Sequence, residues 1–131
     1  VHGLPLMGTG DWNDGMNRVG REGKGESVWL GFFLYHILDA FLPLAAAGDD
    51  AARVVRYRDY QGRLRAALNA DGWDGAWYRR AWYDNGAPLG SAKSDECQID
   101  AIAQAWAVLS GPWPRRAAPT GRPGSSRCSR R

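Results

Sequence analysis

The sequence predicts an all-α fold in which helices form two concentric layers, with one short hairpin inserted. Three stretches of the 131 residues lead to this prediction. Residues 28–47 are apolar along nearly their whole length, residues 51–68 are amphipathic, and residues 94–109 carry apolar side chains at helical spacing. An apolar helix followed by an amphipathic one is typical of an inner element covered by an outer one.

Residues 8–16, Gly-Thr-Gly-Asp-Trp-Asn-Asp-Gly-Met, predict a tight loop. Glycine permits turns that other residues resist, and glycines stand on both sides of Trp12. Residues 20–25 predict a flexible polar loop. They resemble a phosphate-binding loop only weakly, because the glycine spacing differs and Gly25 follows the lysine where that motif has Ser or Thr.

The apolar segment 28–47 predicts a helix with Ser27 as its N-cap. The segment is long enough to cross a membrane. However, His36 and Asp39 lie in its middle, Pro43 would kink it, and a charge near the bilayer centre is costly. We therefore expect a helix buried on nearly all sides within a larger helical domain, and no transmembrane segment.

The remaining elements follow from turn and helix signals. Gly48-Asp49-Asp50 predicts the end of the first helix and the cap of the second, over 51–68. Aromatic residues crowd 77–83, where they would pack between helices or line a saccharide groove, and Asp84-Asn85-Gly86 predicts a hairpin turn.

The last predicted helix begins at Ser94-Asp95-Glu96 and is closed by Gly111. Its apolar face is expected to contain Ile99, Ile102, Ala103, Trp106 and Leu109.

The net charge of +3 averages two unlike parts of the chain. Residues 1–110 contain 11 basic and 14 acidic side chains, whereas residues 111–131 contain six arginines and no acidic residue. We therefore divide the chain into a helical part, 1–111, and a basic Pro/Gly/Ser/Arg-rich tail, 112–131, expected to be disordered or to come from a shifted reading frame. The acidic main part gives no reason to expect a nucleic-acid partner.

Trp12 lies among acidic and amide side chains, a combination typical of sugar sites. A flat indole stacks on a pyranose ring, while carboxylates bind hydroxyls or protonate a glycosidic oxygen. Asp14 is the candidate catalytic acid, and Trp12, Asp11 and Asn13 are candidates for substrate binding. Alternatively, Asp11 caps the loop, Asn13 orders it and Trp12 takes part in ordinary packing.

A calcium loop is the other chemistry that these residues suggest. Asp11, Asn13 and Glu22 occupy its first, third and twelfth positions. However, Met16 stands at the sixth position, which requires glycine. We predict no metal site.

Taken together, five stretches resemble glycoside hydrolase family 94, and most closely its glucan-synthase branch. These stretches are residues 3–6, 10–17, 25–30, 74–81 and 96–106. The resemblance implies an (α/α)6 barrel of the six-hairpin glycosidase type, of which residues 1–111 would be a part.

The same resemblance implies inverting phosphorolysis of β-glucosidic bonds in a β-glucan. Asp14 matches the general acid and Trp12 the neighbouring sugar-contacting residue, while inorganic phosphate is the nucleophile and no cofactor is needed. Phosphate is already an anion, so no second carboxylate is required to activate water. Asp14 would have to hold a proton, which apolar surroundings favour by desolvation. A subsite role for Glu96 is a further expectation.

The resemblance also places the family's phosphate-binding His and Thr, and several sugar-binding residues, outside residues 3–111. We therefore expect this chain to be inactive alone, with the rest of a parent polypeptide as its partner. The expected location is the cytoplasm, or the cytoplasmic domain of an inner-membrane protein. Two alternatives remain open: an inverting hydrolase that uses water, and a non-catalytic carbohydrate-binding segment.

Overall fold

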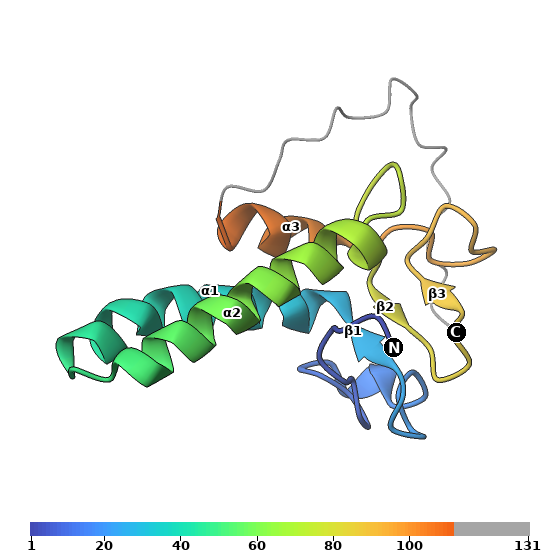
Figure 1. The fold of residues 1–131 in the computed structure, drawn as a ribbon. Helices are drawn as coiled ribbons and strands as arrows, with labels where there is room; N and C mark the ends of the chain where they lie inside the picture. Colours follow the sequence, from blue (N-terminus) through green and yellow to red (C-terminus); the bar gives the residue numbers. More distant parts are fainter. Residues whose placement is uncertain (112–131) are drawn as a thin grey trace.

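Three α-helices and a small antiparallel sheet make up residues 1–111, the part of the chain that the computed structural model describes (Figure 1). The elements in chain order are η1 (Asp14–Met16), β1 (Glu26–Ser27), α1 (Val28–Ala47), α2 (Ala51–Ala67), η2 (Leu68–Gly72), β2 (Ala81–Trp82), β3 (Pro88–Leu89) and α3 (Ala101–Leu109). The prediction of a mostly helical fold with one short hairpin inserted is confirmed, and a further two-residue strand extends that hairpin to a three-stranded sheet. The tail 112–131 lies outside the described residues.

Helices α1 and α2 form a hairpin, and the predicted signals that begin them are confirmed. The Ser27 hydroxyl accepts a hydrogen bond from the Leu30 N–H at 3.1 Å and so caps α1. The Asp50 carboxylate accepts one from the Arg53 N–H at 2.9 Å and caps α2. The two helices lie side by side, and α3 packs against α1 (Figure 1).

Residues 1–111 cover only part of α1, and its burial on nearly all sides within a larger helical domain stays a prediction. Its buried side chains are concentrated in its first half, while Phe41 and Leu44 near its end are 51% and 63% exposed. Among the described elements, α1 packs mainly against α2 and α3, which cover only part of its surface. By length and hydropathy α1 would also suit a membrane span, a property that it shares with the core helices of soluble proteins.

The sheet has the order β1-β2-β3, with both pairs antiparallel. The predicted hairpin is confirmed: β2 pairs with β3, and Gly86 in the turn has a φ of +80°. Strand β1 was not expected, since it contains only two residues and leads directly into α1. Its residues pair with β2 in the register Glu26 to Trp82 and Ser27 to Ala81.

Helix α3 begins at Ala101, so the predicted start at residues 94–96 is wrong. Cys97 has a φ of +48°, which a helix cannot contain, and Asp100 is the true N-cap, accepting from the Ile102 N–H at 2.9 Å. Ile99 therefore precedes the helix and is 51% exposed, rather than part of its buried face.

The main core lies where the first half of α1 meets the end of α2 and α3. Its most deeply buried members are Val28, Phe32, Leu64, Leu68 and Ala103. A smaller cluster of Met7, Val19 and Ala81 lies beneath the N-terminal loops. Met16 of the loop 8–17 packs against this cluster.

Candidate functional site

The loop that contains Trp12 and Asp14 folds through short-range hydrogen bonds. The Asn13 side chain accepts from the Gly15 N–H at 3.0 Å, and the Met16 N–H donates to the Asn13 carbonyl at 3.0 Å. Asn13 is therefore the N-cap of η1, whose first residue is Asp14. Asn13 therefore orders the loop, because its carboxamide oxygen accepts the hydrogen bond from the Gly15 N–H.

Asp11 fixes this loop to the body of the protein through Arg80. The two guanidinium nitrogens Nη1 and Nη2 lie 2.7 and 2.8 Å from the two Asp11 carboxylate oxygens, and the side chains are 1% and 0% exposed. Asp11 also accepts from the Ser27 hydroxyl at 2.8 Å and from the Asn13 N–H at 3.2 Å. Both of its oxygens are therefore occupied by protein groups, as the loop-capping alternative predicts.

The surroundings of Asp11 favour its charged form. Burial alone would raise the pKa of the Asp11 carboxyl, but hydrogen bonds from Arg80, Ser27 and Asn13, together with the positive charge of Arg80, hold this pKa below its ordinary value of 3.8. Asp11 is therefore a carboxylate that organises the loop, which does not suit it to donate a proton.

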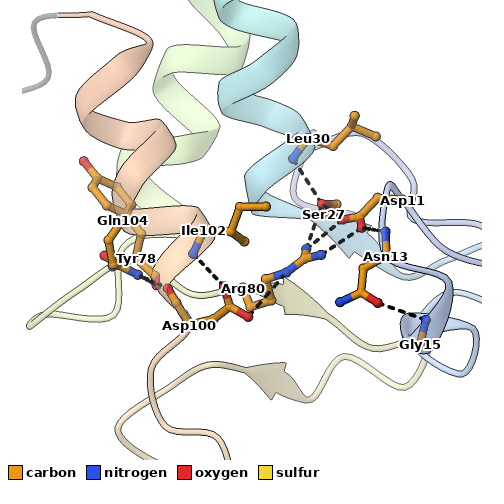
Figure 2. Close-up of polar contacts among 10 residues, drawn as sticks. All are labelled: Asp11, Asn13, Gly15, Ser27, Leu30, Tyr78, Arg80, Asp100, Ile102 and Gln104. Carbon is orange, nitrogen blue, oxygen red and sulfur yellow. Dashed lines mark hydrogen bonds and ion pairs between the residues drawn. The ribbon is translucent and has the colours of Figure 1, made fainter.

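Three segments that are distant from Arg80 in the sequence converge on its side chain (Figure 2). Its Nη1 donates to the Ser27 hydroxyl at 3.2 Å, and its Nε lies 3.7 Å from the Asp100 carboxylate at the start of α3. We call Asp11, Ser27, Arg80 and Asp100 the Arg80 cluster. It joins the loop 8–17, the start of α1, the residue directly before β2 and the start of α3.

Trp12 is 63% exposed, and its ring meets Trp29 edge-on with 6.4 Å between centroids. Trp29 itself is buried and stacks on Phe33. Trp12 therefore presents most of its ring to solvent, as a sugar platform requires, while one edge is supported by the aromatic side chains of α1.

Asp14 is exposed at the start of η1, adjacent to the loop-capping Asn13. The apolar surroundings expected for a proton-holding acid are not formed by residues 1–111. The described chain thus supplies the position of the candidate acid but leaves it open to solvent.

Glu96, the remaining candidate, is exposed in the segment between β3 and α3. It is not one of the residues that the Arg80 cluster brings together. Sequence reasoning missed Arg80 and Asp100 as members of a site. Asp11 lies 69 positions before its partner Arg80, Asp100 lies 20 positions after Arg80, and no local pattern joins the three.

The loop 20–25 is held in place, so the expectation of a flexible loop is wrong. The Asp84 carboxylate accepts from the backbone N–H groups of Glu22, Lys24 and Gly25 at 2.8 to 2.9 Å. These hydrogen bonds, first that from Glu22, hold the pKa of Asp84 below its ordinary value. A carboxylate of the chain itself thus occupies the N–H groups that a phosphate would need.

The chain is similar to known carbohydrate-active proteins. The family model for the glycosyl hydrolase 94 superfamily, catalytic domain, matches residues 1–118. The chain is 56% identical over 111 residues to the cyclic beta-(1,2)-glucan synthase NdvB of Rhizobium meliloti (strain 1021), a match that covers 85% of this chain and 4% of the synthase.

Two phosphorylases of Paenibacillus borealis are also similar. The 3-O-beta-D-glucopyranosyl-beta-D-glucuronide phosphorylase is 39% identical over 85% of this chain, and the solabiose phosphorylase 42% identical over 84%. Each match covers 14% of the phosphorylase. The chain therefore spans a small part of the length of the curated relatives that it matches.

Proposed function

The chain belongs to the glycosyl hydrolase 94 superfamily, and from this premise we propose that the protein containing it cleaves β-glucosidic bonds by inverting phosphorolysis. In this proposal Asp14 protonates the glycosidic oxygen while Trp12 holds the sugar ring beside it. A phosphate oxygen attacks the anomeric carbon from the opposite face, the bond from that carbon to the glycosidic oxygen breaks, and α-glucose 1-phosphate leaves.

The observation that carries the proposal is the division of roles within one short loop. The side-chain oxygens of Asp11 and the carboxamide oxygen of Asn13 accept hydrogen bonds that shape the loop, whereas Trp12 and Asp14 are exposed. A hydrogen-bonded loop that leaves one acid and one aromatic ring available suits a reaction that needs a positioned proton donor. Phosphorolysis does not require the second catalytic carboxylate that a hydrolase uses to activate water.

We further propose a β-glucan as the substrate and an (α/α)6 barrel as the complete domain. The cyclic beta-(1,2)-glucan synthase among the relatives supports the substrate class, and the α1–α2 hairpin with α3 against it suits the barrel. Groups for the phosphate would come from the rest of the domain, and Glu96 is retained as a subsite proposal. The cytoplasmic location stays a prediction.

The test compares the full-length protein with its Asp14→Asn variant. We expect phosphate-dependent release of α-glucose 1-phosphate from β-glucan, and a fall in its rate of about 10²- to 10⁴-fold in the variant, the usual contribution of a general acid. Asp59→Asn is the matched control, because Asp59 is an exposed acid on α2 that forms an ion pair with Arg63. Undiminished turnover by Asp14→Asn would contradict the proposal, and release of free glucose without phosphate would favour the hydrolase.

A further inference from the structure

We propose that Arg80 is a positioning residue for the candidate acid, an inference that rests on the proposed function. Arg80 touches no substrate in this proposal. It sets the place of Asp14 by holding Asp11, three residues earlier in the same loop.

A continuous series of hydrogen bonds runs from Arg80 to the turn that contains Asp14. The guanidinium binds both oxygens of Asp11, and one of these oxygens accepts from the Asn13 N–H. The Asn13 side chain then accepts from the Gly15 N–H across the turn that contains Asp14 (Figure 2). Because the pair with two parallel hydrogen bonds fixes both distance and orientation, a change at Arg80 alters the direction in which Asp14 points.

The position of Arg80 is itself set independently of the loop. Its backbone N–H donates to the Leu89 carbonyl at 2.8 Å and its carbonyl accepts from the Val28 N–H at 3.2 Å. Gly90 lies so close to the Arg80 backbone that a Cβ at Gly90 would be 2.8 Å from the backbone nitrogen of Arg80. The loop is therefore oriented by a side chain whose backbone, directly before β2, is hydrogen-bonded to Leu89 of β3 and to Val28 of α1.

Stability alone is a poor explanation for this arrangement. A buried ion pair is often replaceable by apolar side chains without loss of stability, because desolvation offsets the attraction. What apolar residues cannot supply is the fixed direction of two parallel hydrogen bonds. Arg80 also connects the loop to Ser27 and Asp100, so the acid is oriented relative to the starts of both α1 and α3.

Arg80→Lys in the full-length protein is the first test, because it keeps the charge but loses the planar fork. We expect kcat on β-glucan to fall about 10²-fold, since a misplacement of about 1 Å costs that much. Arg79→Lys is the matched control: Arg79 is also mostly buried and ion-paired, but with Asp74, and it lies over Trp82. We expect this control to change kcat less than about threefold.

The double variant Asp14→Asn/Arg80→Lys separates positioning from general damage. If Arg80 acts through Asp14, its substitution costs nothing further once the acid is gone, so the double variant matches Asp14→Asn alone. If the two losses multiply, or if Arg80→Lys keeps full kcat, the inference is wrong. Asp11→Asn, which keeps an acceptor on the loop, repeats the test should Arg80→Lys fail to fold, as judged by its circular dichroism and Tm.

The two proposals fail in different ways. Full activity in Asp14→Asn would overturn the proposed function whatever Arg80 does. Loss in Asp14→Asn combined with multiplying losses in the double variant would leave the proposed function standing and remove only the role of Arg80.

Discussion

The buried carboxylates of Asp11 and Glu26 are charged because hydrogen bonds outweigh their desolvation. In Glu26, which is 2% exposed, burial alone would raise the pKa, but the His2 side chain and the backbone N–H groups of His2 and Leu4 hold this pKa below its ordinary value of 4.5. In Asp11, burial likewise raises the pKa, and the hydrogen bonds from Arg80, Ser27 and Asn13 lower it below its ordinary value. These two groups link the N-terminal segments to the sheet and to α1.

This balance predicts a loss of stability in acid. A lowered folded-state pKa contributes stability that is present above the unfolded pKa and lost as the pH falls through the folded pKa. We therefore expect the Tm of the full-length protein to decline progressively below about pH 4.5. Asp11→Asn should destabilise at pH 7 by about 3 kcal/mol, because Arg80 keeps its charge without its main partner.

The measurement is the Tm of wild type and Asp11→Asn from pH 7 to pH 3. The difference between the two proteins should shrink as the pH falls, since protonation removes the same charge in the wild type. A constant difference across this range would show that Asp11 contributes by its shape and not by its charge.

At the scale of elements, the starts of the helices were the features that could be predicted best. Ser27 and Asp50 cap α1 and α2 as their residue types indicate, because an N-cap depends on one side chain and the next three residues. The start of α3 could not be predicted in the same way. Three polar residues at 94–96 offered a plausible cap, whereas the left-handed Cys97 that excludes a helix there has no signature in the sequence.

Ser27 and Asp50 differ in what else they contact, and this gives a matched pair of variants. Both Ser27→Ala and Asp50→Ala should destabilise the full-length protein by about 1 kcal/mol, the usual cost of losing an N-cap. Only Ser27 also donates to Asp11 and accepts from Arg80. We therefore expect Ser27→Ala to lower the rate of phosphorolysis, and Asp50→Ala to leave it unchanged.

Thermal unfolding and initial rates on β-glucan measure the two effects separately. Equal rates for the two variants would show that the hydroxyl of Ser27 acts only as a helix cap.

The whole molecule presents apolar side chains that the described residues do not cover. Leu44 at the end of α1 and Val108 at the end of α3 are 63% and 80% exposed. The packing of the apolar α1 against the amphipathic α2 could be predicted from hydrophobic periodicity, because this periodicity reflects which faces avoid water. The way in which these helices are completed into a whole domain could not be predicted, because most of the length of the related proteins lies beyond this chain.

The barrel proposal predicts that further helices cover α1 in the full-length protein. Leu44→Glu should then destabilise it by about 2 kcal/mol or more, because a charge would be buried without a partner. Val55→Glu is the control, since Val55 is 68% exposed on α2, the predicted outer layer, and should change stability by less than about 0.5 kcal/mol. Equal Tm values for the two variants would show that α1 has no such covering.

The central claim is that Asp14 donates a proton to the departing sugar oxygen, and the leaving-group dependence of the Asp14→Asn variant tests it most directly. Full-length wild type and variant are compared on β-glucan, whose leaving alcohol needs a proton, and on 2,4-dinitrophenyl β-glucoside, whose phenolate leaves without one. We predict a loss of about 10²- to 10⁴-fold on the glucan and less than about tenfold on the aryl glucoside. Equal losses on both substrates would contradict the account.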